Sequence, residues 1–522
     1  GSRTGSITGS MSAPEPGDGP LLPGFYAGRA VLITGGTGFL GKVLIERLLY
    51  TCPEVGEVHL LLRDKRGQPP RVRLNQLKQS QAFDKVRAQC PGQLDKLRVV
   101  CGDVAQPRLG LDDAALQQLR EVSYSLSLRM MTGNYINQRA LLSVSQVSVV
   151  FHSAATVKFW ESLETALHQN VTSVVALMDL CDQLPKLEAL VHVSTAYSNA
   201  ERRHIEERVY EAPAQLAGLR AMLDALPPSL LDDLTARYIA PKPNTYVFSK
   251  AVAPAQALRH RHRPAFHRYV TPTTCFYVLV SSHRHPFPGW IENLAGPSGV
   301  VVGCGKGLVH AFNLDLAARA DLIPVDITID TMLAVAWEIA TDKSLEVRVY
   351  NSCSQQNPIT WRAFRDRVVR NVRAHPFDHL MYYPFTFGIK NRYVYKTLEL
   401  VLQTIPLHVA DYLARLCGVK LQLSLVTVSE RLQAMNRVLA FFATREWYFS
   451  TRNVHALRRR LTRADRDIYN LDVCSVDWDE HVRDFVKGTR KFLLKEKDDN
   501  IPRARRFVER SVACSCLQIT RW

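Results

Sequence analysis

Short apolar runs alternate with amphipathic stretches along the first two thirds of the chain. Five of these runs predict buried strands, at residues 30–34, 58–62, 97–100, 148–151 and 189–193. Helical periodicity fills the intervals between them, as in residues 39–50 and 162–184. Strands that alternate with helices need right-handed crossovers, which put parallel strands in one sheet covered on both faces. The pattern therefore predicts an α/β fold with a Rossmann-type doubly wound parallel sheet.

The pattern changes at about residue 357. Segments 361–372, 393–417 and 425–442 have helical periodicity, and no glycine-rich turn follows a strand there. Segment 393–417 is amphipathic, which fits core packing as well as docking to a membrane interface or an acyl chain. We expect four regions, namely a disordered leader at 1–23, a nucleotide-binding domain at 24–356, a smaller helical domain at 357–500 and a basic tail at 501–522.

Composition and charge narrow the choice of partners. The chain is 46% hydrophobic and 22% charged, as in ordinary globular proteins. Its net charge of +17 favours phosphorylated cofactors, coenzyme A or acidic lipid headgroups, and no recognised motif supports nucleic acid. The eleven cysteines have no metal-ligand spacing, so we expect free thiols and no metal site. No apolar window approaches the ~18 residues that would span a bilayer.

A glycine-rich segment, TGGTGFLG at residues 34–41, follows the first predicted strand and opens a helix. Gly35 permits a tight turn, Gly38 lets backbone N–H groups approach a pyrophosphate, and Gly41 permits close packing of helix on strand. The helix N-terminus adds a favourable positive potential for phosphate. A lone glycine triad is weak evidence, but this placement is specific. The predicted dinucleotide-binding residues of this segment are Gly35, Thr37, Gly38, Phe39, Leu40 and Gly41.

The second strand indicates which dinucleotide binds. An NAD enzyme usually has an acidic residue at the end of this strand to bond the ribose 2′-hydroxyl. Here Arg63 comes first, with Lys65 and Arg66 close behind, which suits a 2′-phosphate better, although Asp64 leaves some ambiguity. Asp103 ends the third strand, where it either meets the adenine amino group or caps a turn. We therefore favour NADP over NAD, with Arg63 and Asp103 beside it.

A tyrosine and a lysine four residues apart are the candidate catalytic pair. Tyr246 and Lys250 have the spacing that puts both side chains on one helix face. A free phenol has a pKa near ~10, and a nearby lysine cation lowers that pKa toward the range needed for proton donation. Ser194 and Thr195 end the fifth predicted strand, at the sheet edge where ligands bind, and a hydroxyl there can bond the reacting oxygen.

Several motifs together resemble the alcohol-forming fatty acyl-CoA reductases, which are extended short-chain dehydrogenases. The likeness covers roughly residues 24–120, 147–250 and 286–500, and the set of motifs is highly specific. The motifs in this chain are TGGTGFLGKVLIERLL, FHSAATVKF, HVSTAY, NTYVFSK, PFPGWIEN, GPSG and ADLIPVD.

The resemblance implies that two NADPH reduce a long-chain acyl-CoA to a fatty alcohol and free coenzyme A, through a retained aldehyde. It also implies a Rossmann domain followed by a helical domain, and association with the peroxisomal membrane or the cytosolic face of the endoplasmic reticulum. Tyr246 and Lys250 match the family's catalytic pair. Ser194 or Thr195 matches its hydroxyl partner, and we lean to Thr195.

Two segments depart from the family pattern. Residues 122–146 form an insert that relatives lack, and residues 251–285 replace a helix and strand beside the nicotinamide. Pro254 removes the helical hydrogen bond to the Lys250 carbonyl, so we expect it to kink or end the catalytic helix. Residues 273–280 retain the composition of a β-strand, with their register open. The histidines of the second segment lack ligand spacing, so we expect no metal there.

The residues alone are compatible with two other functions. An NADP-dependent epimerase, dehydratase or hydroxysteroid dehydrogenase shares the glycine turn and the Tyr246–Lys250 pair, but leaves PFPGWIEN, ADLIPVD and the helical domain without a role. A catalytically impaired isoform that binds NADP without turnover is suggested by the replaced segment 251–285. Acyl chain length and oligomeric state are not encoded in these motifs.

Overall fold

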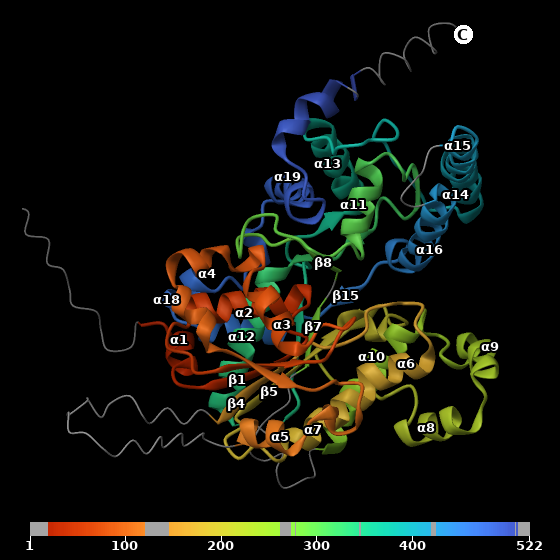
Figure 1. Ribbon diagram of the computed structural model, residues 1–522. Coiled ribbons are helices and arrows are strands. Elements are labelled where there is room, and N and C mark those ends of the chain that lie inside the picture. The colour runs from red at the N-terminus through yellow and green to blue at the C-terminus, as the bar shows by residue number, and fades with distance from the viewer. Residues whose placement is uncertain are drawn as a thin grey trace, which may run out of the picture.

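The computed structural model describes residues 19–120, 146–260, 273–276, 278–343, 346–418, 424–506 and 508–509. The lower part of the molecule is a twisted sheet with helices on both faces, and a mainly helical region lies above it (Figure 1). Residues 452–468 return from the helical region to the sheet, and the next helix, residues 478–488, lies in the helical region again.

The central sheet has seven strands in the order β12-β7-β5-β4-β1-β2-β3, and all its pairings are parallel. The order reverses between β1 and β4, which is the switch point where doubly wound sheets bind ligands. This confirms the predicted fold class, and each of the five predicted strands is present, with ends shifted by two residues at most. The strands are β1 Ala30–Thr34, β2 Val58–Leu62, β3 Leu97–Cys101, β4 Val147–His152, β5 Ala189–Thr195, β7 Thr273–Phe276 and β12 Val349–Ser352.

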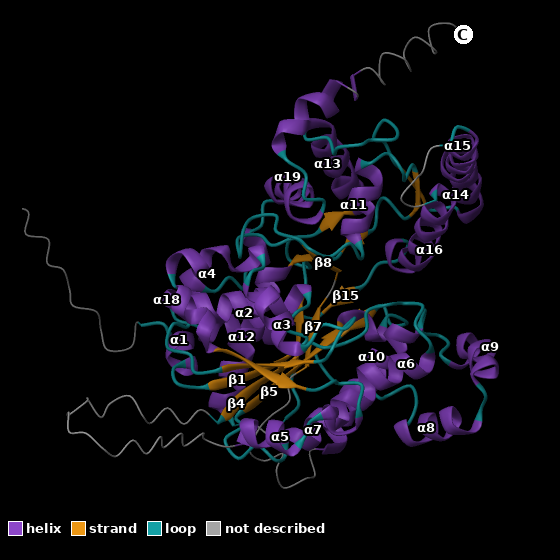
Figure 2. Cartoon of the chain, viewed as in Figure 1, coloured by secondary structure: helices purple, strands orange, loops and turns teal. Residues whose placement is uncertain are grey.

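Two apolar clusters, one on each face, hold this sheet. Along β1, Val31 and Ile33 belong to one cluster, whereas Ala30 and Leu32 belong to the other. Because successive side chains of a strand point to opposite faces, a strand buried on both faces reads as the continuous apolar run seen here. The helices of the first face include α2 Phe39–Thr51, α4 Asp84–Gln89 and α12 Val325–Asp342, and those of the second α5 Asp113–Arg120, α7 Ser173–Cys181 and α10 Thr245–His260 (Figure 2).

Smaller elements complete this layer. The predicted helix at 162–184 is present as α6 Leu163–Leu167, a π-helical turn His168–Thr172 and α7. The others are α1 Leu21–Tyr26, α3 Pro70–Lys78, α8 Leu216–Ala225, α9 Pro228–Tyr238, and β6 His204–Ile205, which pairs with β15 Tyr448–Phe449.

The three helical segments predicted beyond residue 357 are all helical. The middle one consists of α14 Arg392–Glu399, a π-helical turn Leu400–Thr404 and α15 Ile405–Leu416; the other two are α13 Trp361–Ala374 and α16 Leu425–Ala443. Helix α11 Pro297–Gly305 packs against α13, as does α19 Trp478–Gly488. The short strands of this region are β8 Val278–Val280, β9 Ala311–Asn313, β10 Arg319–Ala320, β11 Leu322–Pro324, β13 Ile359–Thr360 and β14 Phe387–Ile389.

A late segment of the chain returns to the sheet layer. Helices α17 Arg452–Arg460 and α18 Arg463–Ile468 lie beside α12 and α2, and Leu457 belongs to the same apolar cluster as Val31 and Ile33 of β1. Buried Arg47 of α2 connects the returning segment to the helices that cover the sheet. Its Nε lies 2.7 Å from Asp330 Oδ1 of α12, and its Nη2 lies 2.6 Å from the carbonyl oxygen of Ile468 at the end of α18.

Of the two effects expected of Pro254, a kink or an end of the helix, the end is wrong, because α10 continues to His260. The Lys250 carbonyl, which Pro254 leaves without an N–H donor, receives the Ser194 hydroxyl at 3.5 Å instead. The atypical segment also provides a sheet strand, because β7 pairs in parallel with β5 and β12. The N–H groups of residues 283–285 donate to the Asp326 carboxylate at 2.7–3.0 Å, which fixes the end of this segment.

The predicted insert 122–146 lies outside the described residues except for Gln146, as do His262 and His267. In the described part of the chain, no helix is long and apolar enough to cross a membrane. Nor do the described residues contain a cluster of three or more histidine, cysteine or carboxylate side chains suited to a metal ion.

Candidate active site

The glycine turn lies between β1 and α2, at the switch point of the sheet. Gly35 has a φ of +76°, and a Cβ there would lie 2.7 Å from the backbone nitrogen of Ala154. A Cβ on Gly41 would lie 2.6 Å from the Cα of Gly36, so only glycine lets α2 approach the turn so closely. The steric roles predicted for these two glycines are therefore confirmed.

Helix α2 presents its N-terminus to this edge of the sheet. Gly38 is the N-cap residue, and among the described residues no side chain caps the helix. Its first backbone N–H groups point along the axis toward the place where a pyrophosphate would lie. The ring of Phe39 stacks on Trp290 at a centroid distance of 5.2 Å, which ties the helix start to the PFPGWIEN motif. Leu40 is half-buried beside it.

Arg63 and Asp103 meet at the neighbouring strand ends. Arg63 Nη1 lies 3.1 Å from Asp103 Oδ2, and the Arg63 side chain is half exposed. The other Asp103 oxygen accepts the Ala105 N–H at 3.0 Å, so Asp103 caps a turn, as one of its two predicted alternatives requires. This ion pair holds the Arg63 guanidinium at the carboxyl edge of the sheet, beside the end of β2.

Arg73 is a candidate binding residue that the sequence reasoning missed. It lies on α3, where Nη2 donates to Thr37 Oγ1 at 3.0 Å and Nη1 donates to the Arg63 carbonyl at 2.7 Å. Burial and the nearby Arg63 lower the pKa of Arg73, which is the response of a cation held beside another cation. Its sequence signal is only a basic residue in the first turn of a helix, too common to distinguish it.

Thr195 and Tyr246 line one cavity, at the carboxyl end of β5 and the start of α10. The Tyr246 ring meets Phe159 edge to face at 5.4 Å. Buried Lys250, one turn along α10, donates its ammonium to the Val193 carbonyl at 2.9 Å. Ser194 is not among the residues lining the cavity, because its hydroxyl is directed to the Lys250 carbonyl. The structure thus places Thr195 and Tyr246 at one cavity, with Lys250 one helical turn beyond Tyr246, and gives Ser194 a different contact.

Two buried histidines lie beside Lys250 and were also missed. His152 of β4 and His192 of β5 are paired in the sheet register and stack at 5.4 Å. The Nδ1 atom of His152 lies 2.7 Å from Thr34 Oγ1, next to the glycine turn. Burial, and secondarily the Lys250 cation, lower the pKa of His152 to about 3, so the ring is neutral. The neutral His152 ring connects the glycine turn to β5 without adding a second positive charge beside Lys250.

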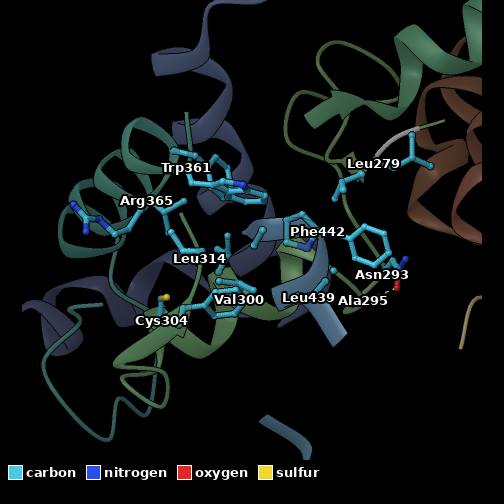
Figure 3. Close-up of a pocket in the computed structure, with 18 of the residues that line it drawn as sticks. Leu279, Asn293, Ala295, Val300, Cys304, Leu314, Trp361, Arg365, Leu439 and Phe442 are labelled. Carbon is cyan, nitrogen blue, oxygen red and sulfur yellow. Dashed lines mark hydrogen bonds between the residues drawn. The ribbon is translucent and has the colours of Figure 1, made fainter. Parts of the chain in front are cut away.

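The cavity continues from Thr195 and Tyr246 into the helical region. Its volume is about 240 Å³, and its wall is mostly apolar, with many of the side chains coming from α11, α13 and α16 (Figure 3). Figure 3 shows Leu279 and Asn293 at one end, with Cys304, Trp361 and Arg365 toward the other. Further lining residues are Val157, Val300, Val301, Phe312, Leu314, Val368, Leu439 and Phe442.

Comparison with known proteins identifies the family. Two family models described as "Male sterility protein" match residues 33–124 with 137–332, and residues 402–496; the first is an NAD-binding domain. Fatty acyl-CoA reductase 1 of Rattus norvegicus is 31% identical over 490 residues, which is 94% of this chain and 89% of the relative. The chain belongs to the fatty acyl-CoA reductase family. Human fatty acyl-CoA reductase 2 has the same identity and coverage, and the gap in the first match, 125–136, falls within the predicted insert.

Solved reductase structures share the fold of this fatty acyl-CoA reductase family member. The terminal R domain of the myxalamid biosynthetic pathway has a TM-score of 0.55 at 16% identity, with 88% of this chain and 90% of that chain covered. A nonribosomal peptide synthetase R domain from Mycobacterium tuberculosis has a TM-score of 0.54 at 18% identity, with 88% and 91% covered. The chain is thus an enzyme with a dinucleotide-binding reductase fold.

Proposed function

We propose that this protein reduces long-chain fatty acyl-CoA to fatty alcohol and coenzyme A with NADPH. The observation that carries the proposal is the apolar cavity that ends at Thr195 and Tyr246. An aliphatic chain gains free energy when such a wall removes it from water, roughly 0.8 kcal/mol for each methylene. An acyl chain held in this cavity would place its thioester carbonyl carbon beside the hydroxyl groups of Thr195 and Tyr246.

The residues at the glycine turn fit NADPH. The open N-terminus of α2 and the space kept by Gly38 suit the pyrophosphate, because a Cβ on Gly38 would lie 3.2 Å from the Gly35 carbonyl oxygen and cover the turn. Arg63 and Arg73 offer two guanidinium groups for a 2′-phosphate. Asp103 holds Arg63 beside the end of β2, and the ammonium of Lys250, now bonded to the Val193 carbonyl, would bond the nicotinamide ribose.

The catalytic roles follow from the positions of the side chains. When bound, NADPH supplies the hydride that reduces the acyl carbonyl. The hydroxyls of Thr195 and Tyr246 donate to the oxygen on which negative charge develops. Stabilisation of this charge in the transition state is usually the largest single contribution to catalysis. Tyr246 then gives its proton to that oxygen, and the Lys250 ammonium beside it favours the phenolate left behind.

Two reductions are needed to reach the alcohol. The first gives a thiohemiacetal, whose C–S bond breaks to leave an aldehyde. The departing coenzyme A thiolate takes up the hydroxyl proton and leaves as the free thiol. The second reduces the aldehyde to the alcohol, and each reduction consumes one NADPH and one proton. Because the lining from Val300 to Phe442 is apolar, it retains the alkyl chain between the two steps. The strongly basic chain, with a net charge of +17, suits the phosphates of coenzyme A and of NADPH.

The family resemblance further supports a cellular setting at a membrane. We place the protein at the peroxisomal membrane or the cytosolic face of the endoplasmic reticulum, in peripheral contact. Both the acyl substrate and the fatty alcohol product partition into lipid, so a contact with the bilayer shortens their path.

The test is product analysis with palmitoyl-CoA and NADPH. We expect hexadecanol and free coenzyme A, with about two NADPH consumed for each alcohol. Tyr246→Phe should lower turnover by roughly 10²–10⁴-fold while NADPH binding, followed by fluorescence, stays nearly intact. Tyr238→Phe, an exposed tyrosine on α9, is the matched control and should leave both unchanged.

Other outcomes of this experiment would support one of the alternative functions instead. NADPH binding without consumption by any acyl-CoA would identify the catalytically impaired isoform. Oxidation of a sterol or sugar in place of acyl-CoA reduction would identify an epimerase, dehydratase or hydroxysteroid dehydrogenase. Full activity in Tyr246→Phe would remove the assigned proton donor.

A further inference from the structure

Helices α14 and α15, with the π-helical turn between them, form one continuous arm over residues 392–416 at the edge of the molecule farthest from the sheet (Figure 1). The arm buries two polar side chains, Gln403 and Asp411, and exposes many apolar ones, whereas an ordinary surface helix exposes mainly polar residues. Its buried residues recur every four or eight positions along one face, namely Tyr395, Gln403, Leu407 and Asp411.

The buried polar groups attach the arm to the rest of the protein. Gln403 Oε1 accepts the backbone N–H groups of His310 and Ala311, both at 2.7 Å. The Asp411 carboxylate accepts the Leu425 N–H at 2.7 Å and so caps the start of α16. Gln403 and Asp411 therefore have fixed partners, and these bonds, together with the packing of α15 on α16, hold the arm in place.

The opposite face of the arm is apolar and open to solvent. Tyr393 is 82% exposed, Leu416 65% and Tyr412 63%. Scattered exposed apolar residues need no explanation, but a continuous row along a helix of six turns does. The other members of this row, which we call the apolar row, are Val394, Leu400, Val401, Ile405, Val409 and Leu413.

Most of the charges around the apolar row are positive. The arm's exposed charged side chains are Arg392, Lys396 and Arg415, of which Arg415 forms an ion pair with buried Asp411 at 2.8 Å. A groove between α14 and α16 adds the guanidinium groups of Arg437 and Arg445, with the partly covered Glu399 as the one acidic side chain among its described lining residues. Cations beside an exposed apolar helix face are the pattern of a helix that lies in a membrane interface and contacts anionic headgroups.

We propose that the apolar row of this arm inserts into the surface of an anionic lipid bilayer, parallel to the membrane plane. The assignment gives a specific surface to the membrane contact proposed above, and it does not depend on the reductase chemistry. The long stems of Arg392, Lys396 and Arg415 let their charged ends reach the headgroups while the apolar row lies deeper.

Charge favours lipid over a second copy of the chain. A symmetric dimer through this face would bring Arg392 and Lys396 of both copies to one interface, and the repulsion between these cations costs free energy. An anionic bilayer offers complementary charge to both. Helix α16, which packs against α15, also lines the catalytic cavity through Leu439 and Phe442, so the arm connects lipid to the site of reduction.

The test is flotation of the full chain with vesicles of equal parts phosphatidylcholine and phosphatidylserine. We expect binding that weakens as salt rises, because exposed charges are screened beyond a Debye length of ~10 Å at 0.1 M salt. Val409→Glu combined with Leu413→Glu should weaken binding by at least about tenfold. The matched control is Leu230→Glu with Leu234→Glu, which adds the same charges on exposed positions of α9 and should leave binding unchanged.

NADPH fluorescence shows whether each variant remains folded, and turnover of acyl-CoA in the absence of vesicles tests the reductase function separately. Equal vesicle binding by the Val409/Leu413 variant and the wild type would overturn the proposal, as would a wild type that never floats. A dimer that these substitutions dissociate, without any vesicle binding, would replace lipid by a second copy. Equal binding to pure phosphatidylcholine vesicles would contradict the assigned role of the cations.

Discussion

The hydroxyl of Ser194 donates to the carbonyl oxygen of Lys250 at 3.5 Å, across the gap between β5 and α10. That carbonyl lacks its helical donor, because residue 254, four positions on, is a proline. A hydroxyl on a neighbouring strand thus takes the place of the missing N–H. The contact explains how α10 continues past Pro254 and separates the roles of two adjacent hydroxyl residues.

This relationship predicts opposite effects for the two hydroxyls. Thr195→Ala should lower kcat by roughly 10²–10³-fold, because it removes a donor to the developing oxyanion. Ser194→Ala should instead lower the free energy of unfolding by about 1 kcal/mol, with kcat changed by less than about twofold. Kinetics with palmitoyl-CoA and thermal unfolding of both variants would measure this.

Thr195→Ser serves as the control for the first substitution, because it restores a hydroxyl and should recover most of the activity. It also retains an oxygen for the Tyr197 N–H, which Thr195 accepts at 3.3 Å. A larger loss of turnover in Ser194→Ala than in Thr195→Ala would reverse the two assignments.

The sheet could be predicted because its information is local. Each strand that is buried on both faces is a continuous apolar run, and Gly35 and Gly41 stand where backbone approaches backbone. The pairing of Tyr246 with Lys250 also needs only helix geometry. Local patterns of this kind are sufficient to predict the fold class and the edge of the sheet at which the dinucleotide binds.

The remaining features depend on distant segments. The cavity wall joins residues from about 157 to 443, and no single segment carries a signal for it. Arg73 matters only because α3 brings it to Thr37, 36 positions earlier in the chain. Pro254 was misjudged for the same reason, since the donor that compensates for it lies 56 residues from Lys250.

Arg73 should select the phosphorylated cofactor. Arg73→Ala is expected to raise the KM for NADPH by about tenfold or more, because a charge-assisted bond to the 2′-phosphate is lost. The KM for NADH, which has no such phosphate, should change little. Initial-rate measurements with both cofactors would separate this effect from a general loss of binding.

Arg71→Ala is the matched control, since this exposed arginine lies on the same helix two residues earlier. It should leave both constants near those of the wild type. An equal rise in KM for NADH and NADPH in Arg73→Ala would show that the residue only supports the glycine turn through Thr37.

The turn itself tolerates no side chain at Gly41. In Gly41→Ala the new methyl group would lie 2.6 Å from the Gly36 Cα, so α2 must move away from the turn. We expect a loss of about 1–3 kcal/mol in stability and loss of NADPH binding by fluorescence. Gly218→Ala in α8 meets nothing within 4 Å and should stabilise the protein by about 0.5–1 kcal/mol. Unchanged NADPH affinity in Gly41→Ala would contradict the need for close approach.

Glu46 should make the stability depend on pH. Its side chain on α2 is fully buried, and neither carboxylate oxygen has a hydrogen-bond partner among the described residues. Burial raises the pKa of Glu46 from 4.5 to about 7. Because the folded state therefore holds its proton more tightly than the unfolded state, stability is fully present below pH 4.5 and is lost as pH rises through about 7.

The loss should amount to about 3 kcal/mol once Glu46 is ionised in both states. Glu46→Gln stays neutral and should remove this part of the pH dependence, so urea midpoints at about pH 5 and about pH 8 should lie closer together than in the wild type. Glu211→Gln, an exposed carboxylate, is the control and should keep the wild-type slope. If Glu46→Gln kept that slope as well, the buried carboxyl would have to be ionised in the folded protein, balanced by the nearby cations of Arg47 and Lys85.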